Sequence, residues 1–297
     1  MPTAVNELSV RENGVEAGGS VVEAHFPSNS DTLEGKGTAV LFVHGYNNSR
    51  SAARASFEGF VLGLECASGR GALPWPVFGV QWPGDEPNAA ISAASYPLKI
   101  KVTQRAAEKI FEHLTGIFGP GGAPVVLHVV AHSLGCRLTL ELLDKLARGT
   151  PGANVIISSV TLMAAAVPVG KVETDGRLRR GVDSADRVCV LHSTGDAVLH
   201  WAFPLGQTAG GDGFFPTAIG RFGGPTGMWM RATSMSAEGN LYGHGSYWQG
   251  AESASTAAAL MGVAVANTIP LSLTPSHALP TANTMAMRTV SERRLPR

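Results

Sequence analysis

The sequence predicts an α/β fold in which helices cover both faces of a mostly parallel sheet. Short aliphatic runs that are rich in β-branched residues, such as 125–130, read as buried strands. They alternate with stretches whose apolar residues recur at helical spacing, such as 51–66. Strands that alternate with helices form parallel sheets, and ligands gather at the carboxyl ends of such strands.

Composition narrows the function classes. The chain has 297 residues, of which 44% are hydrophobic and 15% charged, and 23 basic residues balance 23 acidic ones. A zero net charge without long basic runs gives no reason to expect a nucleic-acid partner. Cys66, Cys136 and Cys189 are too scattered for a disulfide framework or a zinc site, so we expect no metal and no cofactor.

The termini indicate a soluble protein. Residues 1–18 are polar, without the apolar segment of a signal peptide, and we expect them to be a flexible lead-in. The longest apolar run near the C-terminus, 257–266, has about half the length of a membrane span. We therefore expect a cytoplasmic protein with no integral membrane segment.

The first half of the chain contains most of the predicted strands. An edge strand is expected at 20–26, and two buried strands at 38–43 and 77–82. The helical spacing over 51–66 connects these two buried strands, and 89–118 is helical with a break near Pro97.

The second half continues the alternation. A helix at 134–148 follows the central strand, and further strands are expected at 156–166 and 187–193. Residues 201–227 are rich in glycine, proline and aromatic residues, which favours a wall or lid over a site. A last strand at 228–232 and a helix at 254–267 precede a tail, 270–297, that we expect to be disordered. We therefore expect one domain, over residues 19–269.

The segment Ala131-His132-Ser133-Leu134-Gly135 separates the central strand from a helix. Strand, small residue, serine, glycine and helix is the layout of a nucleophile elbow, which exposes a serine hydroxyl above the sheet. The alternative is that Ser133 only caps the helix.

A serine hydroxyl needs a base, and the base needs an orienting group. Asp196 follows a strand at a Thr-Gly-Asp turn, where it is the candidate acid; its alternative role is a helix N-cap. Asp212 is the reserve candidate, whereas Asp183 and Asp186 precede the strand, at its wrong end.

Nine histidines compete for the role of the base. His244 lies between two glycines in a loop before the last helix, which lets its ring turn into a site; the alternative is a turn histidine that bonds only backbone. His128 and His192 lie inside strands, where core positions are expected. His132 flanks the serine, and His200 lies unusually close to Asp196 in sequence.

The oxyanion of an acyl-transfer reaction needs two hydrogen-bond donors. The backbone N–H groups of Leu134, after the serine, and of Tyr46, after His44-Gly45, are the candidates. Apolar side chains for an acyl pocket, each of which could equally belong to the core, are Trp201, Phe203, Phe214, Phe215 and Trp229.

The order Ser133, Asp196, His244 is that of α/β-hydrolases. Together with 43–48, 81–83 and 193–196, these residues resemble a poorly characterised bacterial α/β-hydrolase family with V-H-G-Y-N and A-H-S-x-G motifs, over about residues 38–250. The resemblance implies an α/β-hydrolase fold with Ser133 as nucleophile, Asp196 as acid and His244 as base. Gln81 replaces an expected serine, and the glycine-rich insertion after Trp201 leaves the substrate open.

The sequence therefore predicts a serine hydrolase, most simply a carboxylic-ester hydrolase acting on a small ester or acyl substrate. A thioesterase, an amidase or an acyltransferase would use the same residues. A hydrolase-fold protein that binds a ligand without turnover is the alternative from another class.

Overall fold

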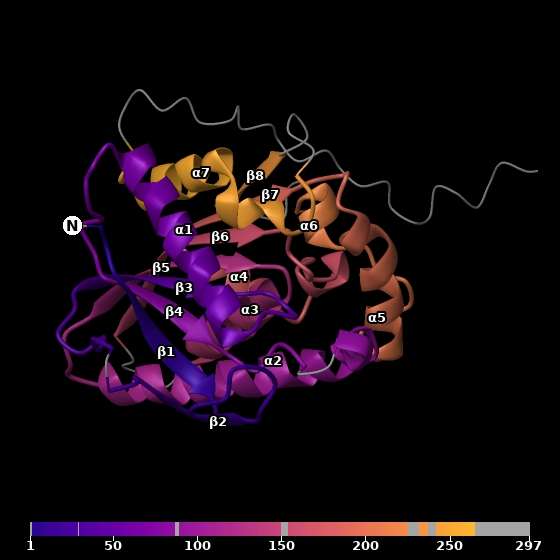
Figure 1. Ribbon diagram of the computed structural model, residues 1–297, viewed down its shortest axis with the longest axis horizontal. Helices are drawn as coiled ribbons and strands as arrows, with labels where there is room; N and C mark the ends of the chain where they lie inside the picture. The colour runs from indigo at the N-terminus through magenta and orange to yellow at the C-terminus, as the bar shows by residue number, and fades with distance from the viewer. Residues whose placement is uncertain are drawn as a thin grey trace, which may run out of the picture.

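The computed structural model describes residues 2–28, 30–86, 89–149, 154–224, 232–236 and 242–264, with the backbone alone at 89–94 and 232–236. Its centre is an eight-stranded sheet of order β2-β1-β4-β3-β5-β6-β7-β8 (Figure 1). Every neighbouring pair is parallel except β1 and β2. The strands are β1 Val5–Arg11, β2 Val21–His25, β3 Thr38–Val43, β4 Val77–Gln81, β5 Val125–His132, β6 Val155–Met163, β7 Arg187–His192 and β8 Ala232–Ser236.

Helices lie on both faces of this sheet, as the sequence predicts. The α-helices are α1 Arg50–Ser68, α2 Ala89–Ile117, α3 Leu134–Arg148, α4 Arg179–Asp183, α5 Phe203–Ala209, α6 Ile219–Phe222 and α7 Ala251–Met261. The core on one face packs against α2, α3 and α4, and the core on the other packs against α1 and α7. The mostly parallel sheet with helices on both faces, expected from the sequence, is thus the architecture of the protein.

Strand alternation divides the apolar residues between these two cores. In β3, Leu41 and Val43 join the core beneath α2 and α3, whereas Val40 and Phe42 join the core beneath α1. Successive side chains of a strand point to opposite faces, so a strand buried on both faces is apolar throughout. This is why the short aliphatic runs of the sequence mark the central strands.

The N-terminal residues differ from the prediction. Instead of belonging to a flexible lead-in over 1–18, Val5–Arg11 forms β1, which pairs with β4 along five residue positions from Val5 to Ser9. The edge strand β2 is where the sequence places it, and it covers β1. The second half of β1, from Leu8 to Arg11, is buried, but the polar residues Asn6 and Glu7 precede it. The sequence therefore shows no aliphatic run there.

Three other boundaries also differ. The helix α2 runs through Pro97 without the expected break: the proline removes one intrahelical hydrogen bond and crowds the preceding turn, yet the residues on both sides stay helical. The last strand is Ala232–Ser236 rather than 228–232, of which 228–231 lie outside the described residues. The last helix ends at Met261, since Gly262 adopts a left-handed conformation (φ 79°) that closes it.

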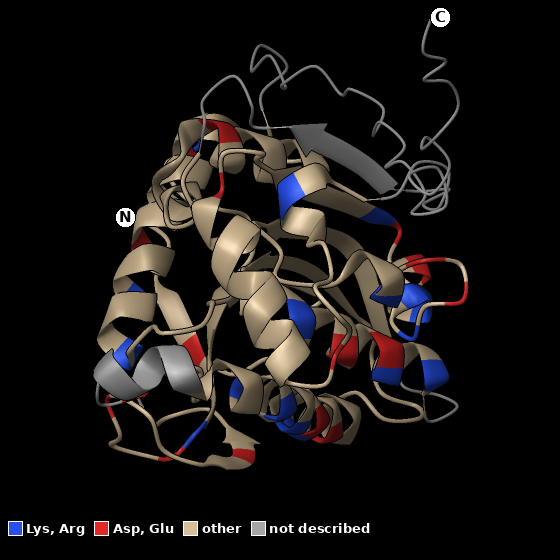
Figure 2. Cartoon of the chain, turned by 90° about the vertical axis from the view of Figure 1, so that its right-hand side faces the viewer, with Lys and Arg blue, Asp and Glu red and all other residues tan. Residues whose placement is uncertain are grey.

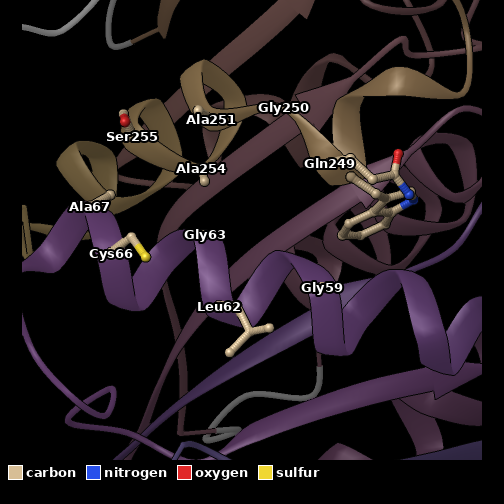
Figure 3. Close-up of a pocket in the computed structure, with 11 residues that line it drawn as sticks. Gly59, Leu62, Gly63, Cys66, Ala67, Gln249, Gly250, Ala251, Ala254 and Ser255 are labelled. Carbon is tan, nitrogen blue, oxygen red and sulfur yellow. The ribbon is translucent and has the colours of Figure 1, made fainter.

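The helices α1 and α7 approach closely at small residues. A Cβ atom on Gly63 would lie 2.9 Å from the Cβ of Ala254, so glycine is needed where the two helices meet. Beside this contact a groove of about 490 Å³ opens between α1 and residues 248–255, with the exposed Cys66 on its wall (Figure 3). Neither Ser133, Asp196 nor His244 lines this groove.

Candidate active site

The carboxyl ends of four parallel strands meet at one edge of the sheet. β3, β4, β5 and β7 lead there to His44, Trp82, Ser133 and Ser193. The loop 242–245 lies at the same edge, because its His244 bonds both the residue after β5 and the turn after β7.

Ser133 occupies a strained turn between β5 and α3. Its φ of 52° and ψ of −123° lie outside the regions that non-glycine residues favour. Its side chain makes no capping bond to α3, so the N-cap alternative does not account for the serine. Backbone bonds hold the strained residue in place: its N–H donates to the carbonyl of Met163 (2.9 Å), and its carbonyl accepts from Ala166 (3.1 Å).

His244 connects Ser133 to Asp196. Its Nε2 lies 2.8 Å from the Ser133 Oγ, and its Nδ1 lies 2.8 Å from the Asp196 Oδ2. Asp196 is completely buried, and its other oxygen, Oδ1, accepts the N–H of Leu199 (2.9 Å). The aspartate therefore caps the following helical turn and bonds the histidine at the same time.

The loop after β3 packs tightly against the elbow because it contains glycine. A Cβ atom on Gly45 would lie 2.8 Å from the Cβ of Ser133, and one on Gly135 would lie 2.3 Å from the carbonyl oxygen of His44. No side chain fits at either position. The two glycines thus bring the backbone of the H-G-Y-N-N segment against the serine.

His44 and Trp82 hold this loop from below. Their rings stack at 5.4 Å, and the Trp82 indole N–H donates to the His44 carbonyl oxygen (2.9 Å). Burial lowers the pKa of His44 to about 3, so its ring stays neutral at physiological pH. His44 and Trp82 therefore stabilise the loop after β3 and are not proton-transfer groups.

Leu134 follows Ser133 directly, and Tyr46 follows Gly45, whose backbone lies against Ser133. Leu134 begins α3, where helical geometry leaves its N–H without an intrahelical acceptor. The carbonyl oxygen of Tyr46 accepts from the amide of Asn48 (3.0 Å), and its hydroxyl is 3.0 Å from the Ser95 Oγ.

A buried ion pair supports the same loops, and the sequence analysis missed it. Arg11, at the end of β1, is fully buried and donates to the Asp85 Oδ1 (2.7 Å) and to the carbonyl oxygens of Trp82 (2.8 Å) and Asn48 (3.3 Å). It joins the loop after β3 to the loop after β4. A single arginine in a polar segment gives no pattern that would reveal this role.

We expect Arg11→Met to lower the free energy of unfolding by about 3–5 kcal/mol, because it leaves the Asp85 carboxylate buried without its charged partner. Urea denaturation followed by circular dichroism would measure it. The control is Arg54→Met, which breaks the exposed pair with Glu58 and should cost less than about 1 kcal/mol. Equal effects of the two substitutions would contradict this account of Arg11.

The predicted substrate-binding residues differ widely in exposure. Phe203 is buried in the core on the α1 face of the sheet. Trp201 and Phe214 are 70% and 86% exposed, and Trp229 lies outside the described residues.

Residues 197–216 include one acid, Asp212, and no Lys or Arg. Figure 2 faces the α5 side, where most of the ribbon is neither basic nor acidic.

The glycine-rich insertion contains short helices. Its apolar residues show no helical spacing, so the sequence did not predict them. A π-helical turn, Val198–Ala202, continues directly into α5, and α6 follows. A helix of four to seven residues is too short to show a repeat of apolar positions.

The competing candidates have other partners. Asp212 binds Arg137 and Lys171 at 2.6 Å each, and these cations lower the pKa of its carboxyl. His128 is a core residue, as predicted: its Nδ1 is 2.7 Å from the Ser159 Oγ, and burial lowers its pKa to about 4. His200 stands edge-on to Trp201.

The described residues hold no group of three or more His, Cys, Asp or Glu side chains arranged as a metal site. None of the helices within them is long and apolar enough to cross a membrane.

A protein-family model matches a large part of this chain. Residues 28–209 match the model of a family described as "Alpha/beta hydrolase of unknown function (DUF900)". The match covers more than half of the chain, and the protein belongs to this family. No curated protein matches the chain.

Solved structures that this chain resembles include two esterases and the protein Est1E. The Pyrobaculum calidifontis esterase is 13% identical, with a TM-score of 0.37, and the match covers 79% of this chain and 80% of that one. Carboxyl esterase 2 of Tuber melanosporum is 12% identical (TM-score 0.39; 77% and 78% covered). Est1E from Butyrivibrio proteoclasticus is 9% identical (TM-score 0.39; 81% and 90% covered).

Proposed function

We propose that the protein is a serine hydrolase that cleaves carboxylic esters through Ser133, His244 and Asp196. One observation carries the proposal: the His244 ring lies 2.8 Å from both the Ser133 Oγ and the Asp196 Oδ2, at a serine held in an elbow conformation. Nucleophile, base and orienting acid in hydrogen-bond contact are what activation of a serine requires.

The first half of the reaction forms an acyl-enzyme. The Ser133 Oγ attacks the ester carbonyl carbon while His244 Nε2 takes the hydroxyl proton, and Asp196 stabilises the resulting imidazolium. The N–H groups of Leu134 and Tyr46 would hold the oxyanion. The C–O bond to the alcohol then breaks, and His244 returns its proton to the leaving oxygen.

The second half regenerates the enzyme. A water molecule gives a proton to His244 and attacks the acyl carbon, and the acid leaves as the Ser133 Oγ recovers its proton. These reaction steps need no cofactor. The same residues would serve a thioesterase, an amidase or an acyltransferase, which differ in the leaving group or in the acceptor.

A matched substrate panel tests the class of reaction. An oxygen ester, a thioester and an amide with the same butanoyl group would be compared by kcat/KM. We expect the oxygen ester to be hydrolysed, and the amide to be the poorest substrate because its amine is the poorest leaving group. Failure of the folded protein to turn over any of them, or any acyl length from acetyl to dodecanoyl, would favour a binding protein with a hydrolase fold.

The exposed aromatic residues give a second expectation about the substrate. We propose that Trp201 and Phe214 contact the acyl part of the substrate at an open surface, since both project into solvent on the insertion that follows Asp196. Trp201→Ala should raise the KM for dodecanoyl esters about tenfold, because one side chain's apolar contact is lost, and leave acetyl esters within about twofold. The exposed Leu62 on α1 provides a control, Leu62→Ala, and an equal effect on both acyl lengths would contradict this role.

A further inference from the structure

His132 is a buried histidine beside the nucleophile that the reaction itself does not use. It ends β5 and is only 5% exposed. Its Nε2 lies 2.6 Å from the main-chain carbonyl oxygen of His244. A carbonyl oxygen only accepts hydrogen bonds, so the Nε2 of His132 must carry the proton and donate it.

Burial fixes this protonation. Burial, with a smaller contribution from the neighbouring His244, lowers the pKa of His132 to about 3. At neutral pH the ring is therefore uncharged, with its single proton on Nε2. Nδ1 is buried and unprotonated, and it has no partner among the described residues. Gly45 leaves the space for it, since a Cβ there would lie 2.9 Å from Nδ1.

The ring of His132 also packs against the segment that contains the proposed base. Its centroid lies 5.1 Å from the ring of His244, 6.2 Å from Tyr247 and 6.1 Å from Trp248. Trp248 is itself enclosed by three aromatic rings of β3 and α1: Phe42, Phe57 and Phe60. Trp248 thus fixes the far end of this segment in the core, and the bond from His132 fixes the end at His244.

We propose that His132 is a positioning residue, whose Nε2–H holds the main chain of His244 so that the His244 ring spans Ser133 and Asp196. The loop before His244 contains Gly243, and Gly245 follows it, so the backbone there is permissive and needs an external restraint. His132 supplies one from the residue directly before the nucleophile. Its neutrality keeps a second positive charge away from His244 when that ring takes the serine proton.

This proposal rests on the proposed function, and two substitutions of matched shape test it. His132→Gln keeps an N–H donor on a flexible side chain, whereas His132→Met has the same length and no donor. The control is His128→Met, which removes another buried histidine of β5 that bonds Ser159 instead of the 242–248 segment. Circular dichroism and thermal unfolding would establish that all variants are folded.

The first readout is the rate at which a fluorophosphonate labels Ser133. His132→Met should slow labelling and lower kcat about five- to tenfold with KM unchanged, as expected for the loss of one buried hydrogen bond. His132→Gln should recover to within about twofold of wild type, and His128→Met should label at the wild-type rate. A merely structural role would reduce the fraction of active enzyme in all buried-histidine variants without rescue by glutamine.

The second readout does not depend on activity. The proton between His244 Nδ1 and Asp196 should give a downfield NMR resonance that His244→Ala removes, that His132→Met weakens or broadens, and that His132→Gln retains. If the wild type is labelled, and His132→Met shows the wild-type labelling rate and an unchanged resonance, the positioning role is overturned and the hydrolase proposal stands. No labelling of the wild type, with a resonance that still responds to His132→Met, would overturn the hydrolase and leave the positioning role standing.

Discussion

Replacing Ser133 with alanine is expected to lower kcat/KM for ester hydrolysis by about 10⁴-fold or more, because the residue that would form the acyl-enzyme is removed. The fold should survive, since the Ser133 side chain makes no cap to α3. Initial rates on a butanoyl ester would measure the effect. Ser56→Ala, at a half-buried position of α1, is the control and should retain wild-type rates. Activity that survives Ser133→Ala would mean that another group attacks the ester.

Substitutions at position 133 should also differ in stability. A serine at a φ of 52° carries strain that glycine avoids, so Ser133→Gly should be more stable than Ser133→Ala by about 1 kcal/mol. Both variants should be inactive. Chemical denaturation of the two proteins would measure the difference, and a less stable glycine variant would show that the elbow is not strained.

Replacing Asp196 with asparagine is expected to lower kcat by about 10⁴-fold with little loss of stability. Asparagine can still accept the N–H of Leu199, so the cap on the following turn would remain. Its amide cannot stabilise an imidazolium, and an NH₂ group facing His244 Nδ1 would favour the wrong tautomer.

The experiment on Asp196 needs a control and a measure of folding. Asp183→Asn removes an exposed carboxylate on α4 that pairs with Arg179, and it should leave kcat unchanged. Thermal unfolding would show whether the Asp196 variant is folded. A folded Asp196→Asn variant with near wild-type kcat would exclude this carboxylate as the orienting acid and direct attention to other groups near His244.

Much of the fold could be predicted because its central strands are buried on both faces. Such strands appear in the sequence as aliphatic runs, and 38–43 and 125–130 lie where β3 and β5 are observed. The strand β1 could not be predicted this way, because polar residues interrupt its apolar ones and only its second half is buried. Alternation of strands and helices then predicted the parallel sheet correctly.

The site could be assembled from sequence because each of its residues follows the end of a strand or lies in a glycine-flanked loop. The structure brings Ser133, Asp196 and His244 into contact, as their order suggested. Long-range partners left no local signal. Neither the bond from His132 to His244, 112 residues apart, nor the pairing of Arg11 with Asp85 produces a sequence pattern. Exposure was equally hidden: Phe203 and Phe214 look alike in sequence, yet one is buried and the other is exposed.

Intact-mass analysis after treatment with a fluorophosphonate tests most directly whether Ser133 is an activated nucleophile. We expect a single adduct on the wild-type protein and on Ser56→Ala, and none on Ser133→Ala or His244→Ala. Peptide mapping should place the adduct on Ser133. A folded wild-type protein that takes no adduct, or an adduct that persists in Ser133→Ala, would contradict the account.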